Sequence, residues 1–205
     1  MAEIILGQKP LLKPFLARIY GVTYNEFVEW HAVEASAEWL DGQVVLESLW
    51  DESAICLVNW LYDLIRGVCQ SAGRNQVLSP HSLQSLRSGR QFSPAISVRR
   101  ISPQSNETTG QRADWIVELV TQANRPYCLG EKRDYYRAEK IPEIWYVDPD
   151  RRMVIVDHLQ GGEHQRATIN TGMLNSTAVP EFWLDVDWLW QSPLPPVDKC
   201  KSAIL

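Results

Sequence analysis

One segment of the chain has the apolar periodicity of an amphipathic helix. Between residues 53 and 72 the apolar side chains recur every three or four positions, and the opposite face is polar. The apolar face consists of Leu57, Leu61, Leu64, Val68 and Ala72. Gly73 follows at the position where helices commonly end on a left-handed residue. The pattern predicts a helix that packs one face against the core.

A different pattern predicts a hairpin nearer the start of the chain. Residues 37–40 and 43–46 are strand-like, and Asp41-Gly42 between them is typical of a two-residue hairpin turn. Before this hairpin, Thr23 and Glu26 have the spacing of a capping box, which predicts a short helix over the residues that follow.

The middle of the chain predicts a central strand. Residues 114–121 (DWIVELVT) are apolar on both faces, as in a strand that is covered on both sides. A helix is expected over residues 129–140, and residues 101–112, which have no apolar period, are expected to form a loop. Further strands are expected at 76–79, 95–98, 143–147, 152–157, 163–169 and 182–186, the last two at sheet edges. Together these elements predict an α/β fold with a mixed central sheet flanked by helices, preceded by an N-terminal helix and hairpin.

Length and composition fit one globular domain. The chain has 205 residues, 45% of them hydrophobic and 22% charged, so it can form a core without disulfide bonds. We expect an N-terminal arm over residues 1–20, a single domain over 21–190 and a loose, Pro-rich tail over 191–205.

The net charge of −5 argues against a protein that wraps nucleic acid with a broadly basic surface. Contact with DNA would therefore need a local basic patch. Two groups are candidates: Arg87, Arg90, Arg99 and Arg100, and then Lys132, Arg133, Arg137 and Lys140. The ordinary alternative for each group is the solvated face of a helix or strand.

Several site classes lack support in the sequence. The four cysteines form no CxxC pair and the four histidines are scattered, so neither a zinc site nor a disulfide framework is predicted. No apolar run is long enough to span a membrane, and no glycine-rich phosphate loop is present. We therefore expect a cytoplasmic protein without a membrane segment or a nucleotide cofactor.

Glu118 is the residue that most needs a chemical explanation. It lies in the middle of the predicted central strand, where an ionised carboxylate is costly unless a cation or hydrogen bonds receive it. Lys132 is a candidate partner because Leu129 and Tyr136 place it on the packing face of the next predicted helix. The pair is either a buried ion pair or part of a metal site whose lysine orients water or stabilises a phosphate.

Several blocks around these two residues resemble a known family. They are DWIVE at 114–118, LGEK at 129–132, Tyr136, IPEIWYVDP at 141–149, EWLDG at 38–42 and VPEFWLDVDWLW at 179–190. In order and spacing they resemble the Uma-type family of restriction-endonuclease-like proteins, which belongs to the PD-(D/E)XK nuclease superfamily. The resemblance implies a mixed sheet flanked by helices, usually in a homodimer, and Mg²⁺-dependent hydrolysis of DNA phosphodiesters.

The resemblance also implies roles for individual residues. Glu118 corresponds to a metal ligand and catalytic residue, and Lys132 to the catalytic lysine. The family's Asp, which follows a proline on the neighbouring strand, falls at Ala95 in this chain. We expect Ala95 and Glu118 to lie on adjacent strands with side chains on the same face, so that Ala95→Asp would restore the second metal ligand. Asp114 cannot replace that ligand, because four residues of strand separate it from Glu118 by about 13 Å.

Three functions remain open at this stage. The first is a degenerate nuclease that keeps the fold and binds DNA or a partner without cutting. The second is an active Mg²⁺-dependent endonuclease that recruits a substitute acid, with Glu38 as the first candidate catalytic residue because it matches a family acid. The third is a structural or interaction module whose Trp-rich C-terminal segment forms a dimer face.

Overall fold

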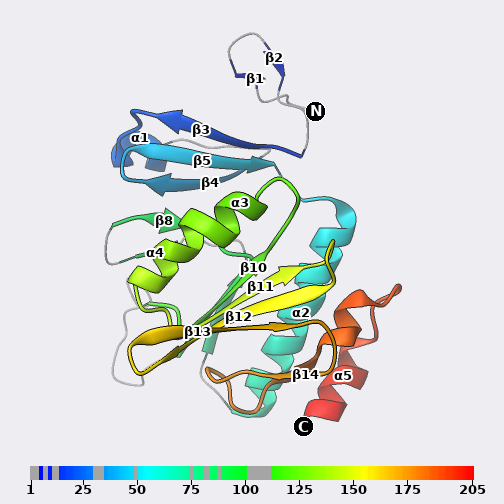
Figure 1. The fold of residues 1–205 in the computed structure, drawn as a ribbon. Helices are drawn as coiled ribbons and strands as arrows, with labels where there is room; N and C mark the ends of the chain where they lie inside the picture. The colour runs from blue at the N-terminus through cyan, green and yellow to red at the C-terminus, as the bar shows by residue number, and fades with distance from the viewer. Residues whose placement is uncertain are drawn as a thin grey trace.

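The computed structural model describes residues 5–6, 9–10, 14–29, 35–48, 50–73, 76–80, 84–86, 89–100 and 112–205. These residues form an α/β protein with a central mixed sheet, a second sheet from the N-terminal part of the chain, and helices against both faces of the central sheet (Figure 1). The predicted fold class is therefore confirmed.

The central sheet has six strands in the order β13-β12-β11-β10-β9-β6. The strands are β6 (Gln76–Pro80), β9 (Ile96–Arg100), β10 (Trp115–Leu119), β11 (Glu143–Asp148), β12 (Met153–Gln160) and β13 (Glu163–Ile169). Only β10 and β11 pair in parallel, and the other neighbours are antiparallel. Every residue of β10 and β11 is buried, as the apolar pattern of 114–121 predicts for a central strand.

The second sheet has five strands in the order β3-β5-β4-β8-β7. Its strands are β3 (Leu16–Tyr20), β4 (Ala35–Leu40), β5 (Gln43–Ser48), β7 (Gln84–Ser85) and β8 (Gln91–Phe92). The predicted hairpin is confirmed: Asp41 and Gly42 connect β4 and β5 with φ values of 50° and 88°, as a two-residue turn with left-handed residues requires. Helix α1 (Tyr24–Glu29) begins at the predicted capping box, in which Glu26 accepts from the Thr23 amide at 2.8 Å.

Two layers of helix cover the central sheet. Helix α2 (Glu52–Ser71) packs its apolar face on one side, in one core cluster with Val117 and Trp145. Helix α3 (Arg125–Tyr127), the π-helical turn η1 (Cys128–Lys132) and helix α4 (Arg133–Ala138) run consecutively on the other side, where Tyr136 packs with Ile116 and Ile144. The helix predicted over 129–140 thus begins earlier and contains a π-helical turn.

The two ends of the described chain are more structured than the sequence predicts. Residues 16–20, expected in an arm, pair with β5 as strand β3. The expected loose tail is wrong, because α5 (Val197–Ile204) packs on α2 and buries Cys200. Residues 182–186 do not join the central sheet: β15 (Trp183–Asp185) pairs with β14 (Met173–Asn175). The division of the chain at residues 20 and 190 stays a prediction, and a further two-stranded pair joins β1 (Ile5–Leu6) to β2 (Lys9–Pro10).

Three further sequence predictions concern a loop with a basic residue, the cysteines and membrane-spanning helices. Residues 101–111 of the expected loop, and Arg87 of the first basic group, lie outside the described residues. All four cysteines are free thiols, as their spacing predicts. Among the described residues no helix is both long and apolar enough to cross a membrane.

Candidate functional site

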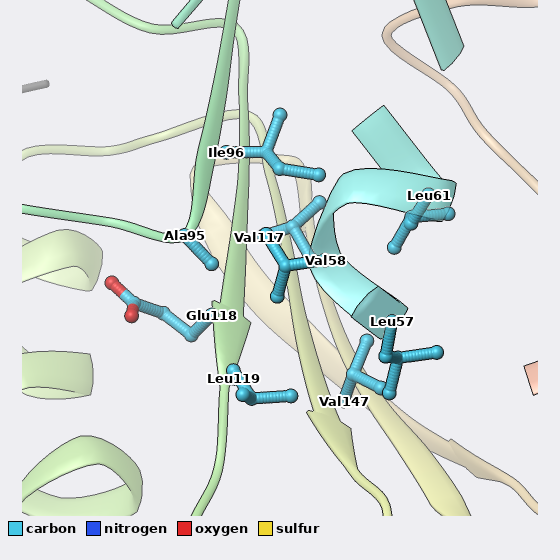
Figure 2. Close-up of a pocket in the computed structure, with 9 residues that line it drawn as sticks. All are labelled: Leu57, Val58, Leu61, Ala95, Ile96, Val117, Glu118, Leu119 and Val147. Carbon is cyan, nitrogen blue, oxygen red and sulfur yellow. The ribbon is translucent and has the colours of Figure 1, made fainter. Parts of the chain in front are cut away.

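Glu118 projects from the central strand toward the helical layer that contains Lys132. Because side chains alternate along β10, Val117 and Leu119 face α2 whereas Ile116 and Glu118 face α4. Figure 2 shows the Glu118 carboxylate pointing away from Leu57, Val58 and Val117. The Tyr136 hydroxyl of α4 donates to Glu118 Oε1 at 2.6 Å.

Lys132 lies between two carboxylates. Its Nζ is 2.7 Å from Glu118 Oε1 and 2.6 Å from Glu38 Oε1. The three residues are almost completely buried, with exposed fractions of 3% for Glu118, 4% for Lys132 and 5% for Glu38. The prediction that Lys132 points toward Glu118 is confirmed.

Glu38 reaches this cluster from the second sheet. It comes from β4, and in addition to Lys132 it accepts from the Ser93 amide at 2.9 Å and from the Tyr127 hydroxyl. The Glu38–Lys132–Glu118 cluster therefore joins β4 to β10 and η1, which come much later in the sequence. Its residues are those that the sequence singled out, and the structure brings them together.

Burial and charge change the proton affinity of the cluster. Burial raises the pKa of Glu118 to about 7, although the nearby ammonium of Lys132 opposes the shift. Burial alone would lower the pKa of Lys132, but the carboxylates of Glu118 and Glu38 raise it above its usual value. Lys132 therefore stays positively charged, and the Glu118 carboxylate binds a proton at a higher pH than an exposed glutamate does.

Ala95 lies beside Glu118, but its side chain faces the other way. Ile96, the first residue of β9, pairs with Val117, so Ala95 just before β9 lies next to Glu118. Their side chains were expected on the same face, and this is wrong: Ala95 packs in the core cluster of α2 (Figure 2). The reason is local, since residue 95 lies in a bend before β9 begins and the alternation of the strand does not extend to it.

A small apolar cavity of about 10 Å³ lies between α2 and the strands β9 and β10. Leu57, Val58, Leu61 and Ala95 are among its lining residues. It is at the limit of what one water molecule needs, and apart from Glu118 its lining residues are apolar, so it is a packing gap and not a ligand site.

Sequence reasoning missed Glu47, a further acid close to the cluster. Glu47 follows Val45 by two positions on β5, and Val45 pairs with Glu38, so the two acids project from the same face as diagonal neighbours. The buried Asn124 amide donates to Glu47 at 2.8 Å and to the Leu119 carbonyl at 3.0 Å. Burial raises the pKa of Glu47, and the charges of Lys132 and Glu38 act on it in opposite directions. The period-two alternation from Val45 was the signal that could have found it.

The second predicted basic group does not form a free cationic patch. Lys132 is inside the cluster, Arg133 pairs with Asp134 at 2.8 Å, and Arg137 pairs with the buried Asp157 at 2.8 Å. Lys140 donates to the Gly162 carbonyl at 2.6 Å. Of the first group, Arg90 pairs with Asp41 and stacks over Tyr135. These five cations of the two predicted groups are thus engaged by the protein itself.

A divalent metal is implied by the resemblance, so the donor set needs to be tested against it. Within the described ranges, no group of three or more His, Cys, Asp or Glu side chains is placed to hold a metal ion. Position 95 supplies a methyl group in place of a carboxylate, and both nearby acids already bind the ammonium of Lys132. The residues present do not fit a Mg²⁺ site of the kind that the resemblance implies.

Comparison with known proteins agrees with this fold. The family model of Uma2, described as "Putative restriction endonuclease", matches residues 24–187. The chain belongs to the Uma2 family. The matched residues include Glu38, Glu118 and Lys132, so all members of the cluster lie within the Uma2 region.

One solved structure shares the Uma2 fold. A crystal structure of a nuclease of DUF820 from Anabaena variabilis ATCC 29413, described as putative, matches with a TM-score of 0.69 at 16% identity. The match covers 82% of this chain and 97% of that chain, which shows a shared fold. A cryoEM structure of a DrdV–DNA complex matches with a TM-score of 0.30 at 14% identity over 57% of this chain and 12% of that chain. No curated protein matches the chain.

Proposed function

We propose that this Uma2 protein has a restriction-endonuclease-like fold that does not hydrolyse DNA. From the description of its family as restriction endonucleases, we propose that it still binds DNA. The observation that carries the proposal is the position of Lys132, whose ammonium engages both Glu38 and Glu118 in a buried cluster. Metal-assisted hydrolysis needs a divalent ion held firmly by carboxylates that are free to bind it. In this chain the two acids have another partner, and Ala95 supplies no oxygen.

Burial of the cluster supports the same proposal. A scissile phosphodiester must reach the metal and the attacking water, but Glu38, Lys132 and Glu118 are each at least nine-tenths covered by protein. Tyr127 and Tyr136 further cover the two carboxylates through their hydroxyl groups. Cleavage at this site would require a rearrangement of the helical layer.

The competing candidate is an active endonuclease in which Glu38 replaces the missing Asp. One observation favours it: Glu38 and Glu118 contact the same nitrogen atom, so their carboxylates lie close together. The third hypothesis, a module whose Trp-rich segment forms a dimer face, has less support, because Trp188 and Trp190 are partly buried against the cluster that includes α2. A homodimer is part of the proposal only through the family resemblance, and light scattering at several concentrations tests it.

The test is a plasmid assay with two readouts. The wild-type chain should nick plasmid DNA in Mg²⁺ or Mn²⁺ no faster than Glu118→Ala, while fluorescence anisotropy detects binding of a labelled duplex by both. Robust cutting by the wild type that is abolished in Glu118→Ala would establish the competing candidate. Absence of duplex binding at low salt would contradict the DNA-binding part of the proposal, since such binding is strongest there.

A further inference from the structure

We propose that the ammonium of Lys132 is the resident cation of the acidic cluster and that it excludes a divalent metal from it. The inference rests on the proposed function, because it gives a physical cause for a site that does not use a metal. It concerns what the wild-type cluster binds, and it makes a prediction about the cluster once the lysine is removed.

The hydrogen bonds of the cluster leave few oxygen atoms for a metal. Glu38 Oε1 receives both Lys132 and the Ser93 amide, and Glu38 Oε2 receives Tyr127. Glu118 Oε1 receives both Lys132 and Tyr136. Among the described contacts, Oε2 of Glu118 alone accepts no hydrogen bond. Mg²⁺ requires near-octahedral oxygen ligands at about 2.0–2.1 Å, so it would have to displace the ammonium and a tyrosine together.

The ammonium is held by more than the two acids. Lys132 Nζ lies 5.9 Å from the ring centre of Phe92 and 5.8 Å from that of Tyr136, so two aromatic rings flank it. The lysine projects from a π-helical turn, and such turns occur frequently at functional sites. Both features position the charge at the point where the two carboxylates meet.

The charge balance predicts the effect of removing the lysine. Glu38 and Glu118, with Glu47 nearby, outnumber the single described cation that contacts them. Without the ammonium these carboxylates would lie in a buried space with no counter-charge, which is strongly unfavourable. A divalent ion could then neutralise these carboxylates, because the Lys132 ammonium no longer lies between them. The lysine and the metal are thus alternative occupants of one position.

The experiment uses MnCl₂ as the probe, with calorimetry and thermal unfolding of the full chain as the readouts. Wild type should show no Mn²⁺ binding that depends on Glu118. Lys132→Met should gain a site, and at about ten times its Kd the melting temperature should rise by roughly 3–6 °C. The matched control is Lys132→Met combined with Glu118→Gln, which should lose this response. Lys132→Gln, which keeps a hydrogen-bond donor but removes the charge, is the second variant.

Two results would overturn the inference. One is Mn²⁺ binding by the wild type that Glu118→Gln abolishes, and the other is a folded lysine variant that gains no binding. If both lysine variants are unfolded without metal, recovery of the far-ultraviolet circular dichroism spectrum with MnCl₂ supports the inference, and no recovery contradicts it. The plasmid assay remains separate: a wild type that binds Mn²⁺ through Glu118 without cutting refutes this inference alone, and one that cuts with a metal held elsewhere refutes only the proposed function.

Discussion

The side chains of Ala95 and Glu118 point to opposite faces of the central sheet although the two residues lie side by side. The methyl group of Ala95 packs toward α2, whereas the carboxylate of Glu118 points toward Lys132 and α4. A carboxylate introduced at position 95 would therefore not reach the cluster unless the bend before β9 changed. The restoring effect expected of Ala95→Asp from the sequence depends on that change.

We expect Ala95→Asp to destabilise the protein by on the order of 3 kcal/mol at neutral pH, because it buries an unpaired charge among apolar side chains. Ala95→Asn is the matched control, since it has nearly the same volume without the charge. Urea unfolding at pH about 8 and pH about 5 separates the two effects, because protonation should reduce the cost of Asp alone. Equal costs for Asp and Asn at both pH values would show that volume, not charge, decides.

Lys132→Met should cost about 3–5 kcal/mol of unfolding free energy without metal, because it leaves buried carboxylates without their partner. Glu131→Gln, one residue earlier, provides a comparison. It breaks the ion pair of Arg18 and Glu131, which is about one-quarter to one-third exposed. This change should cost about 1 kcal/mol or less. If Lys132→Met and Glu131→Gln unfold at the same urea concentration, with the same dependence of the unfolding free energy on urea, the cluster is not a buried ion network.

Stability should depend on pH through Glu118. Its pKa is raised from 4.5 in the unfolded chain to about 7 in the folded protein, so the folded state binds more protons between these values. The stabilising contribution of this group is therefore complete below about pH 4.5 and is lost as the pH rises through about 7.

Glu118→Gln isolates this contribution because glutamine does not titrate. The difference in unfolding free energy between wild type and Glu118→Gln should shift in favour of the variant from about pH 4.5 to 7. The lowered pKa of Asp157, which burial opposes and which Arg166 and Arg137 produce, acts in both proteins and cancels in the difference. A pH-independent difference would contradict the raised pKa.

Glu143 should be a second buried carboxylate with a structural role. It is fully buried and accepts hydrogen bonds from Trp145, Ser176, Thr177 and Ala178. Glu143→Gln should cost about 2–3 kcal/mol, because these donors lose an ionised acceptor. Ser176→Ala removes only one donor and should cost about 1 kcal/mol. Hydrogen exchange at the Thr177 and Ala178 amides should accelerate in Glu143→Gln, and unchanged exchange there would refute the anchoring role.

Local patterns predicted much of the fold. The apolar stripe of Leu57, Leu61 and Leu64 gave the position of α2, and Asp41-Gly42 gave the register of the β4–β5 hairpin. In both cases the structure that the local sequence favours is also the one that packs in the folded protein. The burial of both faces of β10, the strand that contains Glu118, was predicted in the same way from its apolar residues.

Other features depend on contacts between distant residues and could not be predicted in this way. The helix α5 has only a weak local signal and is fixed by packing on α2, where a side chain on Gly67 would meet Lys201 at 3.2 Å. The bend at Ala95 reverses the side-chain direction that strand alternation predicts. Glu47 is different: the predicted hairpin already pairs Val45 with Glu38, so Glu47 could have been found from the sequence, although the family motif does not include it.

The shared contacts of Lys132 have a consequence for the divergence of related sequences. Its two carboxylate partners come from positions 38 and 118, which are separated from it by 94 and 14 positions along the chain. Loss of the lysine leaves two carboxylates without compensation inside the protein, whereas loss of one acid leaves the other paired with the lysine. A neutral path must therefore replace at least one acid before the lysine or together with it. Among relatives that lack the lysine, we therefore expect positions 38 and 118 to covary, with one of the acids replaced by a neutral side chain of similar size.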